Sequence, residues 1–130
     1  ALDRFGDMVE QQHGDRRIVD DYGRLPSAPC QDILAAPRGG FLARLDAHLV
    51  GRGSAALGAG RDRLQDPVDP GVGVVLLARR GERVDAGQPV MRIHYRSNAR
   101  LEAARPLLAE ALVIEDAPGP VRPLILGTVR

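Results

Sequence analysis

The sequence predicts a single domain of the α+β class, in which short antiparallel strands alternate with helices. Apolar residues alternate or cluster in short stretches bounded by glycine and proline, as strands require, within residues 31–46 and 74–95. Residues 47–57 and 97–112 instead show helical spacing. The links between successive strands are short, which favours antiparallel pairing. With 130 residues, 44% of them hydrophobic, the chain can bury one core.

The first 30 residues are predicted to be a helix and linker from a preceding domain, and residues 31–130 to be the domain itself. Residues 1–12 have the pattern of a short amphipathic helix, with Gly14 expected to end it. Because so short a helix is marginal alone, we expect it to dock either on this domain or on a missing partner. The apolar stripe of this helix consists of Leu2, Phe5, Met8 and Val9. Residues 15–29 are predicted to be a polar connector. The chain starts without methionine or a signal-peptide pattern, so we expect it to continue a longer polypeptide.

The next segment is predicted to be a strand pair followed by a helix. Residues 31–37 and 41–46 suit two strands joined by a glycine turn, and we expect them to form a hairpin. The Asp46 carboxylate is placed to cap a helix over residues 47–57. Two glycines weaken this helix, and we expect both to allow a close approach to a neighbouring backbone. They are Gly51 and Gly53. Gly58 is the expected stop.

A second strand pair and a second helix are predicted to follow. Residues 74–78 are continuously apolar, which predicts a strand buried on both faces, and residues 89–95 predict its antiparallel partner after two turns. The helix over 97–112 begins at Ser97 or Asn98 and contains Pro106, so we expect a kink or a restart there. Short strands are expected at residues 113–114 and 124–129, joined by a loop.

The amino-acid composition excludes several classes of function. A formal charge of +1 argues against a dedicated nucleic-acid binder, and no stretch approaches the ~20 apolar residues that span a membrane. All 18 basic residues are arginine, which excludes mechanisms that need a lysine amine. Cys30 is the only cysteine and cannot form an internal disulfide, so we assign it no chemistry and expect a cytoplasmic protein.

Several short motifs have both a functional and a structural interpretation. Residues 58–61, GAGR, could cradle a phosphate, but they follow a helix, and a helix C-terminus repels anions, so a structural turn is favoured. Asp66 and Asp69 each precede proline, which favours two turns over a calcium site. The histidines lack metal-ligand spacing and no serine lies in a G-x-S-x-G context. We therefore expect no catalytic residue, metal ligand or cofactor in this chain.

The strand–turn–strand segment VGVVLLARRGERVDAGQPVMRI resembles the half-repeat of biotinyl and lipoyl carrier domains. A carrier holds its cofactor on an exposed lysine, which this chain lacks. The segment therefore shares the shape of a carrier hairpin without its chemistry.

Taken together, four segments resemble the C-terminal domain of the thymidine phosphorylase and pyrimidine-nucleoside phosphorylase family. They are AAPRGGFLARLDA, LGAGRDRLQDPVDPGVGV, RRGERVDAGQPVMRIH and ARLEAARPLLAEAL. They occur in the family's order and at similar separations, and ALDRFGDMVEQQHGD is similar to the helix that precedes this domain in the family.

The resemblance implies an α/β-hammerhead with barrel-sandwich-hybrid-like strands and two packed helices. It also implies a parent enzyme, expected to be a homodimer, that splits pyrimidine nucleosides with phosphate into free base and sugar 1-phosphate. Phosphate and nucleoside would bind the parent's N-terminal helical and α/β domains, which are the partners that this chain is missing, so we expect the chain alone to be inactive. The edge that meets those domains on closure is expected at Gly58, Gly60, Arg61, Asp66 and Asp69.

A second interpretation stays open on the residues alone. The hammerhead could serve as a non-catalytic binding or assembly module, since carrier-like shapes also mediate protein contacts. Recovery of phosphorolysis on mixing with the upstream domains would favour the phosphorylase interpretation.

Overall fold

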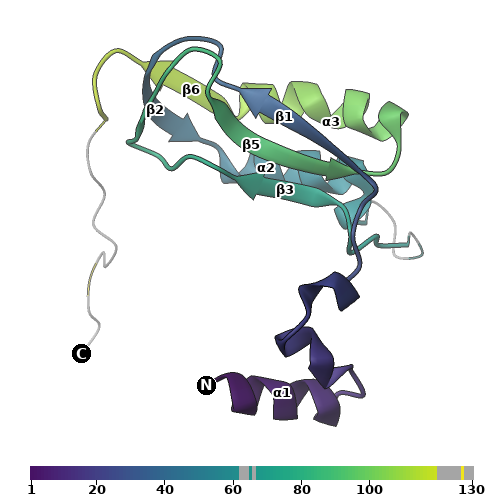
Figure 1. The fold of residues 1–130 in the computed structure, drawn as a ribbon. Coiled ribbons are helices and arrows are strands. Elements are labelled where there is room, and N and C mark those ends of the chain that lie inside the picture. Colours follow the sequence, from purple (N-terminus) through teal and green to yellow (C-terminus); the bar gives the residue numbers. More distant parts are fainter. Residues whose placement is uncertain (62–64, 66, 120–126, 128–130) are drawn as a thin grey trace.

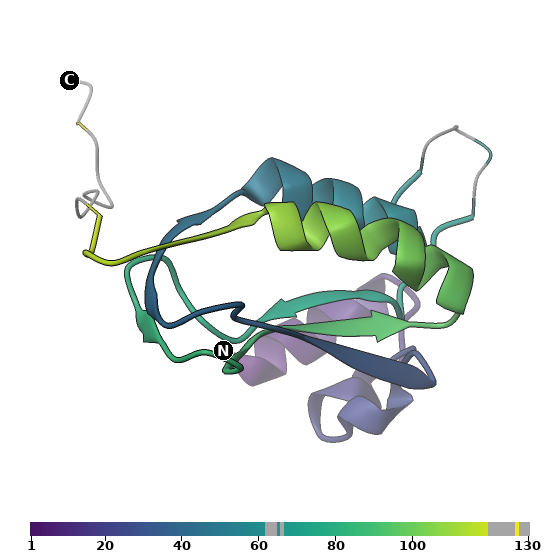
Figure 2. The ribbon, with the colours of Figure 1, turned by 90° about the horizontal axis from the view of Figure 1, so that it is seen from above.

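The computed structural model describes residues 1–61, 65, 67–119 and 127 and shows an α+β fold, as predicted. Two three-stranded sheets pack with two helices (Figure 1). One sheet has the strand order β1-β5-β3 and the other β4-β2-β6. The strands are β1 (Cys30–Ala35), β2 (Gly40–Leu45), β3 (Gly73–Leu76), β4 (Arg83–Val84), β5 (Pro89–Tyr95) and β6 (Leu112–Glu115). Helices α2 (Ala47–Ser54) and α3 (Asn98–Glu110) lie side by side over one face of the β1-β5-β3 sheet (Figure 2).

The predicted hairpin between the first two strands is wrong. β1 pairs antiparallel with β5, from Cys30 opposite Tyr95 onward, whereas β2 pairs with β4 and β6. The chain changes sheets at Gly40, whose φ of +148° suits glycine and where a side chain would collide with the Glu115 carbonyl. Alternating apolar residues specify which face of a strand is buried, but they leave the partner strand undetermined. The second predicted pair is confirmed, because β3 and β5 are antiparallel neighbours.

The core lies between the helices and the two sheets. Its largest fully buried side chains are Leu42, Val84, Val90, Met91, Ile93 and Leu108. At Gly53 the two helices approach closely, since an added Cβ would lie 2.5 Å from Leu108 Cδ2. The expectation of a close approach fails at Gly51, where a Cβ would meet nothing within 4 Å.

The prediction that residues 74–78 are buried on both faces is also wrong. β3 is an edge strand of a sheet that has helices on one face, so it has little cover. Val75 is 46% exposed, Leu76 48% and Leu77 38%, and only Ala78 is buried. The apolar run therefore marks a surface patch on the sheet.

The helices follow the sequence closely, with local differences. The Asp46 carboxylate accepts hydrogen bonds from the His48 and Leu49 amides, which confirms the predicted cap of α2. A wider turn, η3 (Ala55–Ala59), continues α2 and ends where Gly58 takes a φ of +114°, as expected. α3 begins after Ser97 and runs through Pro106 without restarting.

The N-terminal segment contains α1 (Leu2–Gln11) and two short 3₁₀ turns, η1 (Arg16–Val19) and η2 (Tyr22–Arg24). Gly14 was expected to end the helix, but His13 takes the left-handed conformation, at φ 61°, and the Gly14 amide donates to the Val9 carbonyl. Within the described part of the chain, no helix is long and apolar enough to cross a membrane. Of the strand predicted at 124–129, all residues but Gly127 lie outside the described part of the chain.

Candidate functional site

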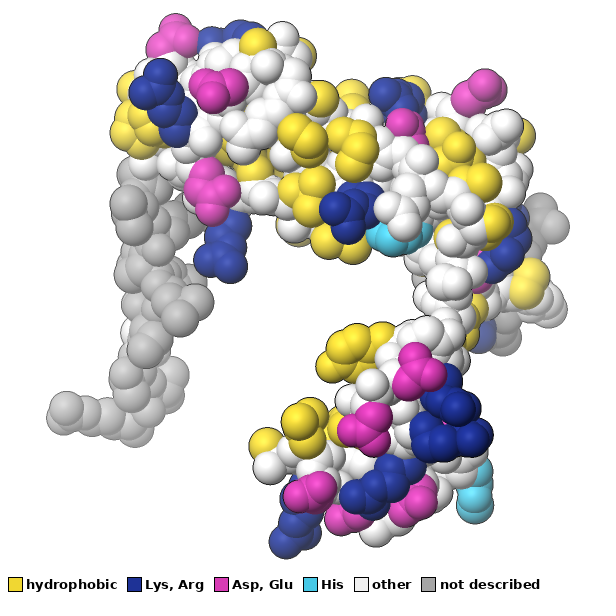
Figure 3. Space-filling model, in the orientation of Figure 1, with side chains coloured by type: hydrophobic (Ala, Val, Ile, Leu, Met, Phe, Trp, Pro, Cys, Tyr) yellow, Lys and Arg dark blue, Asp and Glu magenta, His cyan; other side chains and the backbone are white. Residues whose placement is uncertain are grey.

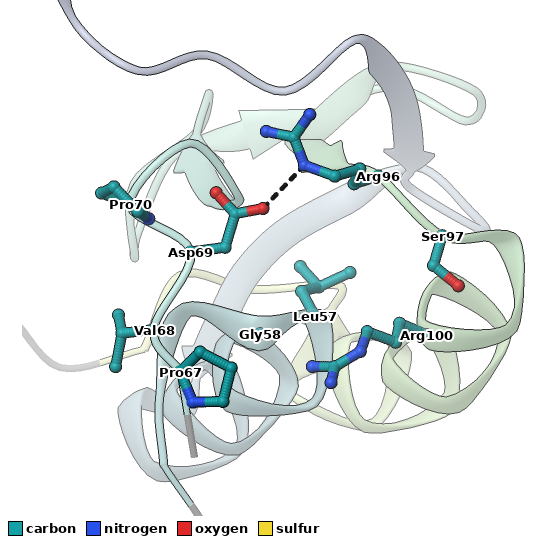
Figure 4. Close-up of a pocket in the computed structure, with 9 residues that line it drawn as sticks. All are labelled: Leu57, Gly58, Pro67, Val68, Asp69, Pro70, Arg96, Ser97 and Arg100. Carbon is teal, nitrogen blue, oxygen red and sulfur yellow. Dashed lines mark hydrogen bonds and ion pairs between the residues drawn. The ribbon is translucent and has the colours of Figure 1, made fainter. Parts of the chain in front are cut away.

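The candidate site is an open pocket of about 470 Å³ where η3 ends and α3 begins (Figure 4). Three segments far apart in the sequence form it: the end of η3, the loop at 67–70, and the start of α3. Its lining consists of Leu57, Gly58, Pro67, Val68, Asp69, Pro70, Arg96, Ser97 and Arg100. The pocket therefore combines an apolar wall with three charged side chains.

Asp69 holds these segments together. Its amide donates to the Gly58 carbonyl at 2.9 Å, and its carboxylate accepts from the Gly71 amide at 2.9 Å in a local turn. The other carboxylate oxygen accepts from Arg96 Nε at 2.8 Å, while Arg96 Nη2 donates to the Ser27 carbonyl at 3.2 Å. Asp69 thus ties the loop to η3 through its backbone amide and to the residue that follows β5 through its side chain.

This arrangement favours the ionised form of Asp69. The Arg96 guanidinium, followed by the Gly71 amide, lowers the pKa of the Asp69 carboxyl from its ordinary value, and Arg100 contributes through its charge. The carboxylate therefore stays charged through the neutral range and serves as an acceptor. Its side chain is 31% exposed, so the pair remains open to solvent on the pocket side.

Arg100 is the second cation of the pocket. Its guanidinium lies over Gly58, where an added Cβ would be 2.9 Å from Nη1. Glycine is thus favoured at position 58 both by backbone conformation and by the room that Arg100 needs. Arg100 forms no ion pair within residues 1–61, 65, 67–119 and 127, and the described lining of the pocket holds two cations, Arg96 and Arg100, and one anion, Asp69.

The structure brings together some of the residues predicted for the closure edge. Gly58 and Asp69 both line the pocket. Gly60 packs against Ala55 beside it, and Arg61 is exposed beyond the turn. Asp66 lies outside the described residues.

Sequence reasoning missed Arg96 and Arg100. Arg96 pairs with a carboxylate 27 positions earlier, and no local pattern signals such a contact. The position of Arg100 in the first turn of α3, facing the preceding glycine turn, had no sequence signal either.

The described lining of the pocket lacks a histidine, the side chain that most often acts as a general base. Among its described lining residues there is no histidine, cysteine or second carboxylate, so Ser97 has no general base beside it. Searched over the described residues alone, His, Cys, Asp and Glu nowhere form a group of three that could hold a metal ion. Arg100 and the ion pair suit recognition of an anionic or polar group.

Comparison with known proteins places the pocket within a recognised domain. Residues 41–115 match the family described as pyrimidine nucleoside phosphorylase C-terminal domain. Over 94 residues, the chain is 39% identical to a pyrimidine-nucleoside phosphorylase of Staphylococcus epidermidis and 35% identical to those of Bacillus subtilis and Staphylococcus aureus. Each match covers 72% of this chain and 22% of the relative, so the chain spans well under half the length of these curated relatives.

Proposed function

The chain belongs to the pyrimidine nucleoside phosphorylase C-terminal domain family, and from this premise we propose that it is the accessory domain of such an enzyme. The parent reaction is the cleavage of a pyrimidine nucleoside by phosphate into free base and sugar 1-phosphate. The parent is a cytoplasmic homodimer, and its N-terminal helical and α/β domains bind both substrates. The family match over residues 41–115 is the observation that carries this proposal.

The two-sheet architecture supports the finer fold description. Two three-stranded sheets with a pair of helices packed on one of them fit an α/β-hammerhead. We divide the chain at residue 30, with residues 1–30 as helix and linker and residues 31–130 as the domain. The family match lies wholly within the second part, and β1 begins at Cys30, the last residue of the first part.

The pocket edge fits a role in domain closure. Displacement at the sugar's anomeric carbon needs donors for phosphate and base, and it is helped when closing domains exclude water. Gly58, Gly60, Arg61, Asp66 and Asp69 form the contact edge in this proposal. Arg61 is the residue to test, because its side chain is exposed and so accessible to another domain. In the whole enzyme, Arg61→Ala is expected to lower turnover, and unchanged kinetics would remove Arg61 from the edge.

The experiment that tests the proposal is reconstitution of activity. The chain is incubated with thymidine or uridine and phosphate, alone and together with the N-terminal part of the S. epidermidis relative. We expect base release only from the mixture. Release of base by the chain alone would show that the active site has been misplaced.

The alternative, a non-catalytic binding module, is favoured by one observation. Ile33 and Val75 on the β1-β5-β3 sheet, and Leu77 just after β3, are exposed outside the lining of the pocket, with Arg92 between Ile33 and Val75. Binding to the N-terminal part without any gain in phosphorolysis would favour this second function.

A further inference from the structure

The pocket where η3 ends and α3 begins has the size and lining of a small-molecule site. Its volume of about 470 Å³ lies within the ~300–1,000 Å³ that such sites occupy. The apolar part of its wall consists of Leu57, Pro67, Val68 and Pro70. Hydrophobic side chains are also exposed over the β1-β5-β3 sheet and on α1 (Figure 3), so the case for a ligand in the pocket depends on its polar groups.

Arg100 is the polar group best placed to hold a ligand. Its guanidinium lies over Gly58, where an added Cβ would be 2.9 Å from Nη1, so the glycine leaves room for a cation at the pocket. Figure 4 shows the Arg100 side chain crossing from α3 toward the loop at 67–70. Because no described carboxylate forms an ion pair with it, this guanidinium can still form a bidentate pair with an oxyanion.

Ser97 adds a hydroxyl on the same side of the pocket. It is the N-cap residue of α3, but its side chain makes no capping hydrogen bond. A serine at this position commonly uses its hydroxyl for the cap. Here the hydroxyl stays able to donate a hydrogen bond to a ligand, and three positions along the chain separate it from Arg100.

The opposite wall is fixed before any ligand binds. The Asp69 amide donates to the Gly58 carbonyl at 2.9 Å, and the Asp69 carboxylate accepts from the Gly71 amide at 2.9 Å and from Arg96 Nε at 2.8 Å. Arg96 in turn donates to the Ser27 carbonyl. A wall that is already ordered lowers the entropy lost on binding.

Asp69 also limits the charge that a ligand can carry. Its carboxylate lines the same pocket and its side chain is 31% exposed, so it repels a second negative charge on a ligand. Arg96 is paired with Asp69, which leaves the charge of Arg100 for the ligand. A monoanion is therefore favoured over a dianion such as a phosphate monoester, and a planar guanidinium matches the geometry of a carboxylate.

The apolar wall requires that the ligand also has a hydrocarbon body. Val68 is 40% exposed, and a hydrocarbon group lying against it would remove apolar surface from water. We propose that the pocket binds a small monocarboxylate with a compact hydrocarbon body, with its carboxylate on Arg100 and its body against Val68 and Pro67. This site goes beyond the proposed function, in which phosphate and nucleoside bind the N-terminal part of the parent.

The test is a titration of the full 130-residue chain with cyclohexanecarboxylate, followed by the amide NMR signals of Gly58, Asp69 and Arg100. We expect saturable binding at millimolar concentrations. Cyclohexylmethanol lacks the charge and acetate lacks the hydrocarbon body, and each is expected to bind at least tenfold more weakly. Arg100→Gln is expected to weaken binding of cyclohexanecarboxylate at least tenfold. Arg52→Gln, which removes an exposed arginine of α2 outside the pocket, is expected to change it less than twofold. Val68→Ser is expected to weaken binding of cyclohexanecarboxylate severalfold and to leave that of acetate unchanged.

The spectrum of each variant without ligand checks that the chain remains folded, and if Arg100→Gln does not fold, the three ligands and Val68→Ser decide instead. Equal binding by Arg100→Gln and the unaltered chain would overturn the assignment to Arg100. Equal weakening by Arg52→Gln would reduce the effect to net charge, against the proposal. Inorganic phosphate that binds as tightly as cyclohexanecarboxylate would make this a site for free oxyanions, also against the proposal. The absence of saturable shifts up to about 10 mM would remove the ligand site. Because all these measurements use the chain alone, their failure leaves the proposed function standing, and reconstitution of phosphorolysis tests that function separately.

Discussion

Two glycines in one helix allow the packing of α2 on α3 to be measured directly. Gly51 and Gly53 are separated by one residue, and both take helical conformations within α2. A Cβ at Gly51 would meet nothing within 4 Å, whereas a Cβ at Gly53 would lie 2.5 Å from Leu108 Cδ2 and 2.8 Å from Leu108 Cγ. Alanine substitution therefore makes the same chemical change at one open and one filled position.

The expected free energies differ in sign. Gly51→Ala should stabilise the chain by about 1 kcal/mol, because alanine has the higher helix propensity and its methyl group meets only solvent. Gly53→Ala gains the same propensity, but it forces Leu108, which is fully buried, or the whole of α3 to move. Overpacking of this kind costs about 1–3 kcal/mol. The net effect at Gly53 is thus a destabilisation of up to about 2 kcal/mol, and the two variants differ by about 1–3 kcal/mol.

Urea unfolding followed by circular dichroism gives the free energy of unfolding of both variants. Equal slopes of the free energy against urea concentration would confirm that both variants expose the same amount of surface on unfolding. Adding Leu108→Ala to Gly53→Ala tests the cause, because the cavity accepts the new methyl group. The double variant should lose less stability than the sum of the single variants by about 0.5–3 kcal/mol. A Gly53→Ala variant as stable as Gly51→Ala would refute the close approach of the two helices.

Three further predictions concern the pocket and the helix start. Gly58→Ala should destabilise the chain by about 1–3 kcal/mol, measured in urea, because of its φ of +114° and the contact with Arg100. Asp69→Asn should lose stability at neutral pH. Since the folded pKa of Asp69 is lowered, its contribution is present above the unfolded pKa of about 3.9 and is lost as pH falls through the folded value. The difference in free energy of unfolding between Asp69→Asn and the unaltered chain should therefore become smaller in acid. A difference that does not change with pH would contradict the ion pair. Asp46→Ala should cost about 1 kcal/mol and shorten α2 at its start, observable as lost amide protection at His48 and Leu49.

Features set by neighbouring residues could be predicted from the sequence. The Asp46 cap and the stop at Gly58 each depend on a few consecutive positions, and both are confirmed. The limits of α1 and β5 also follow from their own periodicity. At the end of α1, however, His13 and Gly14 are both residue types that suit a left-handed conformation. His13 takes it, which lets the Gly14 amide donate to the Val9 carbonyl.

Features set by distant residues could not be predicted. Successive strands alternate between the two sheets, so β2 pairs with β6, which lies about 70 residues later in the sequence. The alternating pattern of β2 would suit a hairpin with β1 equally well. The apolar run at 74–78 illustrates the same limit. Continuous apolar residues predict burial only if both faces of the sheet are covered, and here the helices lie on one face.

The pocket shows how a site can escape sequence reasoning even when its loop is recognised. The sequence offers the glycine-arginine turn at residues 58–61 as a possible phosphate cradle, with Arg61 as its cation. In the folded chain the cations of the pocket are instead Arg96 and Arg100, which arrive with the end of β5 and the first turn of α3. A helix start attracts negative charge where a helix end repels it, so the argument against an anion at η3 does not extend to this side of the pocket. Because Asp69 pairs with Arg96, Arg100 is the pocket cation that has no ion-pair partner among the described residues. Under the proposed role in closure, the other domain would bring a carboxylate or polar group to Arg100. Arg100→Gln, which removes the guanidinium while keeping Gly58 and Asp69, would then separate closure from folding.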